Sequence, residues 1–286
     1  MNAMNAVTQS RFRCRNHLLD VYSKTWIVGV LNITPDSFSD GGRFLNRDAA
    51  IDQAMRMVDE GADILELGGE STRPGAVPVA ADEELQRIVP ILRQLRPRLT
   101  IPLAVDTYKP EVARVVLEEG AEIINDVYGV RGEGQLAAVV AEQQAGLVIM
   151  HMQGTPQDMQ IEPRYTDVVD EVVAFLADRV SRAEQLGVDP QSIIVDPGLG
   201  FGKRPQDNLI LLRHLEKLQC LGKPIMIGPS RKSLVGNILK LPVEQRHYGT
   251  AACVAAAVLQ GAAFVRVHDI LPCAQMVRML DAIKRA

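Results

Sequence analysis

The stretch VGVLNITPDSFSDGG, Val28–Gly42, determines how the whole chain is interpreted. The residues up to Leu31 are apolar and rich in Val, which is typical of a strand buried in a parallel sheet. At Asn32 the character changes, because Pro35 and the paired glycines cannot continue a strand. A polar amide therefore stands at the carboxyl end of a buried strand, where α/β proteins bind ligands. An ordinary strand-to-helix turn explains one such loop, but the pattern recurs along the chain.

Apolar runs and helical patterns alternate through the rest of the sequence. The run at Trp26–Asn32 is followed by further expected strands at 64–67, 102–105, 122–124, 147–150, 193–195, 224–227 and 264–267. A helical pattern follows each of them, and alternation of this kind indicates a parallel sheet. Eight strand–helix units in one domain predict an α/β fold of the (β/α)8 or TIM-barrel type. An open, doubly wound sheet is the alternative.

The length of the chain fits one barrel with a short addition. It has 286 residues, against about 250 for a typical TIM barrel. No linker or change of composition divides it, so we predict a barrel domain over 26–286 and an entry segment over 1–25. Within that segment, 11–22 can form a hairpin or cap that closes the bottom of the fold.

The composition excludes several classes of protein. The chain is 47% hydrophobic and 23% charged, as in ordinary globular proteins, and its net charge of −4 argues against a nucleic-acid surface. The four cysteines lack metal-site or CxxC spacing, which favours reduced, structural thiols. No uncharged apolar run reaches about 18 residues, and the N-terminus has no apolar signal core. We expect a cytoplasmic protein without a membrane span.

The expected strands end on polar or ionisable residues. These are Asn32, Thr72, Asp106, Asn125, His151, Asp196, Lys232, Arg266 and His268. In a barrel the carboxyl ends of all strands lie on one face. Helix capping explains any one of these residues. It does not explain the whole set, which predicts a binding face.

Asp196 indicates what this face binds. It follows Val195 in an alternating strand, so its carboxylate should point into the barrel mouth, where it can accept two parallel N–H donors. Asp106 and Asn125 add an acceptor and an amide, and Lys232 adds a cation. The set fits a slot for a flat heterocycle rich in hydrogen-bonding groups. A buried ion pair between Asp196 and Lys232 is the purely structural alternative.

A second corner of the face suits an anion. Arg266 and His268 alternate on the last strand and can point the same way, close to Asn32 on the first strand. TIM barrels often bind phosphate near strands 7 and 8, and a divalent metal could accompany it. A lone structural histidine is the alternative for His268. Gly198–Gly202 lacks the spacing of a dinucleotide loop, and no catalytic triad is evident.

A family resemblance rests on motifs spread over nearly the whole chain. Alongside LNITPDSFSDGG there are GGESTRPGA at Gly68–Ala76, VDTYKPEVA at Val105–Ala113, INDVYG at Ile124–Gly129, VIMHMQGTP at Val148–Pro156, DPGLGFGK at Asp196–Lys203, GPSRKSLVG at Gly228–Gly236 and VRVHD at Val265–Asp269. In this order they resemble the dihydropteroate synthase family of pterin-binding enzymes.

The resemblance implies a role for each matching residue. Pterin diphosphate would contact Asn32, Thr72, Asp106, Asn125, Met150, Asp196, Gly228, Lys232, Arg266 and His268. The 4-aminobenzoate site would comprise Phe38, Thr72, Arg73, Pro74, Phe201, Lys232 and Ser233. The catalytic residues would be Asp40, Asp106, Lys232, Arg266 and His268. Mg2+ would lie near Asn32.

The implied reaction belongs to folate biosynthesis. A 7,8-dihydropterin carrying a CH2-diphosphate condenses with 4-aminobenzoate, and sulfonamides inhibit it at the 4-aminobenzoate site. Diphosphate would leave first, under a lid that carries Phe38 and Asp40. The apolar segment 249–259 suggests a homodimer. Two alternatives share the pterin slot: a methyltetrahydrofolate-dependent methyltransferase, and a non-catalytic pterin-binding protein.

Overall fold

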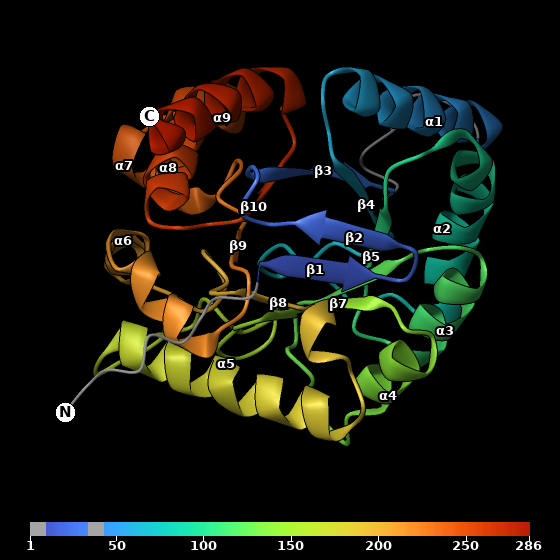
Figure 1. The fold of residues 1–286 in the computed structure, drawn as a ribbon, viewed down its shortest axis with the longest axis horizontal. Helices are drawn as coiled ribbons and strands as arrows, with labels where there is room; N and C mark the ends of the chain where they lie inside the picture. The colour runs from blue at the N-terminus through green and yellow to red at the C-terminus, as the bar shows by residue number, and fades with distance from the viewer. Residues whose placement is uncertain (1–9, 34–42) are drawn as a thin grey trace.

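The computed structural model describes residues 10–33 and 43–286, with side chains from Arg47 onward in the second range (Figure 1). Its barrel strands are β3 (Trp26–Asn32), β4 (Ile64–Gly68), β5 (Leu103–Asp106), β6 (Ile123–Asp126), β7 (Gly146–Met150), β8 (Ile193–Asp196), β9 (Met226–Ile227) and β10 (Phe264–Val267). They are parallel and hydrogen-bond in the order β8-β7-β6-β5-β4-β3-β10-β9. A bridge between Val195 and Ile225 joins the two ends of this order, so the sheet closes into a barrel. The prediction of a TIM barrel is confirmed, and an open sheet is excluded.

Helices surround the strands on the outside. They are α1 (Arg43–Asp59), α2 (Ala81–Leu95), α3 (Pro110–Glu118), α4 (Gln135–Glu142), α5 (Val168–Gln185), α6 (Pro205–Arg213), α7 (Ser233–Leu239), α8 (His247–Leu259) and α9 (Ile270–Arg285). The turns η2 (Arg96–Arg98), η3 (Pro190–Ser192), η4 (Leu215–Leu221) and η5 (Val243–Gln245) are 3-10 helices. Among the described residues, none of the helices combines the length and apolar character needed to cross a membrane.

The helices lie where the sequence pattern predicts them, with three differences near the end of the chain. The last helix is predicted over 276–284, but α9 begins six residues earlier, at Ile270. The pattern predicts one helix over 208–218, but α6 ends at Arg213 and a 3-10 segment follows. Helix α7 was not predicted, because Ser233–Leu239 covers only two turns and shows no clear period. This short helix places Lys232 at its start, so it belongs to the site described below.

Alternation along the strands separates two cores. In β4, Leu65 and Leu67 pack against the helices, whereas Ile64 packs in a smaller core inside the barrel. Glu66 follows the same alternation as Ile64 and faces the interior, where it contacts residues of other strands. In β8, Ile194 packs inside the barrel, and Asp196 comes two residues later. The barrel interior is therefore apolar at the amino ends of the strands and polar at their carboxyl ends.

A hairpin closes the apolar end. Strands β1 (Arg11–Cys14) and β2 (His17–Asp20) pair antiparallel and cross the barrel in front of its strands (Figure 1). Phe12 is fully buried, and its ring meets that of Phe264 edge-on, with centroids 5.7 Å apart. Arg15 Nη1 donates to the carbonyl oxygens of Leu117 and Ala121 at 2.7 and 3.1 Å, which fixes the hairpin to α3. The expected hairpin at the bottom of the fold is confirmed.

Candidate active site

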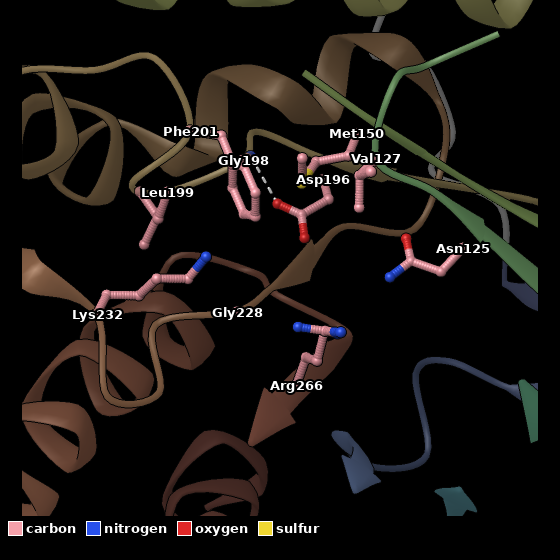
Figure 2. A pocket seen from close by; sticks show the side chains of 10 residues that line it. All are labelled: Asn125, Val127, Met150, Asp196, Gly198, Leu199, Phe201, Gly228, Lys232 and Arg266. Atoms are coloured by element: carbon pink, nitrogen blue, oxygen red, sulfur yellow. Dashed lines mark hydrogen bonds between the residues drawn. The ribbon is translucent and has the colours of Figure 1, made fainter. Parts of the chain in front are cut away.

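A pocket opens at the carboxyl ends of the strands, and charged side chains from different strands point into it (Figure 2). Its lining comprises Asn125, Val127, Met150, Asp196, Gly198, Leu199, Phe201, Gly228, Lys232 and Arg266. Asn125 lies on β6 and Arg266 lies on β10, so residues far apart in the chain meet here because the sheet closes. Seven of these residues were predicted from the sequence as pterin or 4-aminobenzoate contacts: Asn125, Met150, Asp196, Gly228, Lys232, Arg266 and Phe201.

Asp196 is buried and has one oxygen available to a ligand. Its Oδ1 accepts the backbone N–H of Gly198 at 2.6 Å, while Oδ2 has no hydrogen-bond donor among the described residues. The ion pair with Lys232 does not form. Instead, the Lys232 ammonium lies 3.8 Å from the centroid of the Phe201 ring. The structural alternative for Asp196 is therefore wrong, and its carboxylate remains free to bind a donor in the pocket.

Arg266 is held by two carboxylates. Its Nε donates to Glu66 Oε1 at 2.7 Å, and its Nη2 donates to the same oxygen and to Asp106 Oδ2, the latter at 3.0 Å. Asn125 Nδ2 donates to Glu66 Oε2 at 3.1 Å. The side-chain oxygen of Asn125 has no hydrogen-bond donor among the described residues. Glu66 thus fixes both an arginine and an amide at the pocket floor.

Burial shifts two pKa values toward 7, that of Lys232 in the pocket lining and that of Asp106, which accepts from the pocket residue Arg266. Burial and the Glu66 carboxylate raise the pKa of Asp106 to about 8, although Arg266 opposes the shift. Burial and Arg266 lower the pKa of Lys232 to about 7, although Asp196 opposes the shift. Burial also raises the pKa of Asp196, against the hydrogen bond from Gly198. A ligand that pairs with these groups will decide their protonation, because a desolvated charge gains most from a partner.

His268 and Asn32 lie beside the pocket rather than in its lining. His268 Nδ1 is 3.0 Å from Ser230 Oγ, and burial followed by Arg266 lowers the pKa of this imidazole to about 3. At neutral pH His268 can therefore only donate or accept a hydrogen bond. Asn32 ends β3, and its Oδ1 lies beside Gly68, where an added Cβ would be 3.2 Å away.

The remaining predicted residues lie at the rim or outside the described part. Thr72 is half-buried after β4, whereas Arg73 and Pro74 are exposed. Ser233 is exposed at the start of α7. Phe38 and Asp40, together with the lid assigned to them, lie outside the described residues. Each residue's role in binding or catalysis stays a prediction.

Sequence reasoning missed Glu66 and gave no role to Lys203. Glu66 is a lone acid within the apolar run ILELG, and the alternation that placed Asp196 inward would have identified it. Lys203 is buried and contacts mainly backbone oxygens, which no sequence pattern reveals.

Comparisons with known proteins show the family of the chain. The model of a family described as pterin binding enzyme matches residues 28–268. A dihydropteroate synthase from Synechocystis sp. is 45% identical over 94% of this chain and 93% of its own length.

The chain belongs to the dihydropteroate synthase family of pterin-binding enzymes. A Yersinia pestis dihydropteroate synthase solved with a sulfonamide drug is 39% identical, with a TM-score of 0.91 over 96% of this chain and 100% of that one. A Xanthomonas albilineans dihydropteroate synthase solved with 4-aminobenzoic acid is 41% identical, with a TM-score of 0.91 over 98% of this chain and 100% of that one. The family resemblance noted in the sequence is confirmed. The chain is an enzyme of the dihydropteroate synthase type.

Proposed function

We propose that the chain condenses 7,8-dihydropterin-CH2-diphosphate with 4-aminobenzoate to give 7,8-dihydropteroate and diphosphate. The observation that carries the proposal is the convergence of Asp196, Asn125, Lys232 and Arg266 on one pocket in a chain of this family. A flat pterin offers N–H donors for the free oxygen of Asp196. Its carbonyl and ring nitrogens offer acceptors for the amide and the cations.

The order of bond changes follows from the groups present. The bond between the methylene carbon and the diphosphate oxygen breaks first, and its electron pair leaves with the diphosphate. Asp196 and Asp106 stabilise the positive charge that develops on the pterin, and Arg266 faces the departing anion. The amine nitrogen of 4-aminobenzoate then forms the bond to carbon and releases a proton to solvent. No strong base is needed, because an arylamine is neutral at pH 7.

Magnesium fits this site only together with the diphosphate. Within the described residues, no three His, Cys, Asp or Glu side chains come close enough to hold a metal ion. Mg2+ usually keeps several waters and binds through few protein groups plus substrate phosphates, so the side-chain oxygen of Asn32 suits it. When bound, the ion would neutralise charge on the leaving diphosphate.

The 4-aminobenzoate ring would bind against Phe201 and Lys232, beside Thr72 and Ser233. Support comes from the pairing of the Lys232 ammonium with the Phe201 ring at the pocket edge. The Xanthomonas and Yersinia relatives were solved with 4-aminobenzoic acid and with a sulfonamide drug. We extend both ligands to this chain, with sulfonamides as competitors of 4-aminobenzoate. Cytoplasmic location is part of the proposal, and four free cysteines support it.

Assembly as a homodimer is also proposed. Apolar side chains are exposed on α7, α8 and α9, which lie together in Figure 1: Ile238, Tyr248, Leu259, Met279 and Ile283. Tyr248 is 78% exposed and Met279 is 62% exposed, which is unfavourable for a monomer surface at this density. A second copy would cover them. Sedimentation at micromolar concentration should give twice the mass of the chain, and a monomer there would contradict this assembly.

The alternatives predict different products. A methyltransferase on the same scaffold would need no diphosphate corner, and a non-catalytic protein would bind a pterin without turnover. The direct test supplies dihydropterin diphosphate and 4-aminobenzoate with Mg2+ and follows both diphosphate and 7,8-dihydropteroate. Equal amounts of the two products are expected. Pterin binding without either product would reject the proposed reaction.

A further inference from the structure

One wall of the pocket is a short glycine-rich segment, Gly198–Gly202, between β8 and α6. Gly198, Leu199 and Phe201 line the pocket directly (Figure 2). The Gly198 and Phe201 carbonyl oxygens accept from Lys203 Nζ at 2.9 and 3.0 Å. The Gly202 carbonyl oxygen accepts from the Tyr165 hydroxyl at 2.6 Å, and that of Gly200 accepts from Gln160 Nε2 at 2.8 Å. The wall is therefore tied down by donors that come from outside it.

Lys203 makes two of these four hydrogen bonds. Its side chain is buried, and its ammonium group also lies 2.8 Å from His151 Nδ1. With the His151 carbonyl oxygen at 3.4 Å, the three N–H donors of Lys203 face four acceptors, and no carboxylate pairs with them within the salt-bridge distance among the described residues. Burial and Lys203 lower the pKa of His151 to about 2, so the imidazole is neutral and Nδ1 can accept. Burial lowers the pKa of the Lys203 ammonium to about 7, although Asp196 opposes the shift. Whether or not it carries the proton, the buried amine holds these backbone oxygens in place, because each hydrogen bond lost would leave a buried polar group without a partner.

The backbone of the segment has little freedom to adopt other positions. Gly198 has φ +68°, and a Cβ on it would lie 1.9 Å from the carbonyl oxygen of His151. The segment therefore rests directly on the chain that follows β7. Because Lys203 bonds both to this chain, through His151, and to the segment, it joins the two surfaces.

Phe201 connects the segment Gly198–Gly202 to Lys232 in the pocket. The centroid of its ring lies 3.8 Å from the Lys232 ammonium, and a Cβ on Gly200 would lie 3.2 Å from Lys232 Cδ. The position of Lys232, a side chain on a long flexible stem, is thus set by the wall beneath it. We propose that Lys203 is a positioning residue that fixes Phe201 and Lys232 in the geometry that 4-aminobenzoate requires. The inference rests on the proposed function for its substrate.

Replacing Lys203 by Met tests the proposal, because Met keeps the stem and loses every donor. We expect the KM for 4-aminobenzoate to rise about 10-fold or more, with a smaller change in kcat, since a small misplacement of binding groups is costly. Affinity for the pterin should fall by a smaller factor than affinity for 4-aminobenzoate, because two of its proposed contacts, Asn125 and Asp196, stand on strands. An unchanged KM for 4-aminobenzoate in a folded K203M variant would overturn the proposal.

Lys223 supplies a matched control. It is also a buried lysine, with Nζ bonded to the Pro190 carbonyl oxygen at 2.8 Å and to Glu184 at 2.7 Å, but it precedes β9 at the opposite end of the barrel. K223M should lower stability without changing the KM for 4-aminobenzoate. A rise in KM equal to that of K203M would mean general destabilisation and reject the positioning role.

Hydrogen exchange separates this inference from the proposed reaction. The Phe201 amide donates to Gly198 O at 3.1 Å, and the Gly200 amide donates to Asn208 Oδ1 at 2.6 Å, so both should be protected. Their exchange should become at least 10-fold faster in K203M and stay unchanged in K223M, whatever reaction the wild type performs. If K203M fails to fold, Tyr165→Phe removes one tie without a buried charge and should raise KM and exchange in the same direction. Unchanged exchange in folded K203M, or in the Tyr165→Phe variant, would contradict the proposal.

Discussion

The two ends of the barrel interior share the same alternation of inward and outward side chains. The inward side chains are apolar at one end and charged at the other. At the amino ends of the strands, Phe12, Ile64 and Phe264 fill the interior with apolar side chains. At the carboxyl ends, Glu66 and Arg266 occupy the equivalent inward positions and form an ion pair. The backbone pattern is shared, so only residue identity decides whether an end of the barrel stabilises the fold or binds a ligand. Changes at the two ends should therefore separate stability from activity.

The largest effect is expected from removing the central cation. Arg266→Met leaves Glu66 and Asp106 buried without their countercharge, which should cost about 3–5 kcal/mol of stability. It also removes the group that faces the leaving anion, so turnover should fall by about 10³-fold. Urea unfolding and steady-state rates measure the two effects. A variant with wild-type stability would show that the carboxylates do not depend on Arg266.

The opposite end should respond in stability alone. Phe12→Ala empties a fully buried site against Phe264, and changes of this kind cost about 3–5 kcal/mol. Below the unfolding temperature, both KM values should remain within 2-fold of the wild type. Altered KM values in the folded variant would mean that the two ends are coupled, against the separation drawn above.

A smaller and more local effect is expected at Asp196. Asp196→Asn replaces an acceptor oxygen by a donor that faces pterin N–H groups. Hydrogen bonds to charged groups contribute about 1.5–3 kcal/mol, so pterin binding should weaken roughly 10- to 100-fold. Calorimetry with a pterin measures this directly, and unchanged affinity would remove Asp196 from the slot.

The pH dependence of stability gives the smallest effect. Folding lowers the pKa of His151 from 6.5 to about 2, through burial and then through Lys203 and Arg131. Between these values the unfolded state binds a proton that the folded state does not, so stability falls as pH drops below 6.5. The contribution is about 1.4 kcal/mol per pH unit. His151→Gln should lose this part of the slope, measured by urea unfolding at pH 7 and pH 5. Equal slopes in the wild type and in His151→Gln would mean that other groups cause the loss of stability at low pH.

The sequence allowed much of this to be predicted, for identifiable reasons. Asp196 and Arg266 stand at or near the ends of apolar runs, where a change of residue type is visible without a structure. Glu66 was overlooked because it interrupts an apolar run instead of ending it. Lys203 could not be found, since its partners are carbonyl oxygens that only the folded chain brings together. Helix α7 is too short for periodicity to reveal.

The hairpin that closes the barrel also constrains the order in which the molecule can be completed. Phe12 lies in the first described strand and packs on Phe264 in the last, so this contact closes a loop of nearly the whole chain. During synthesis the hairpin leaves the ribosome before the barrel, yet its apolar face has no surface to cover until β10 has been made. Loop closure of this length is slow, and exposed apolar surface invites association in the meantime. A mutation that weakens the hairpin should therefore lower the yield of folded protein more than it lowers the stability of the molecules that do fold.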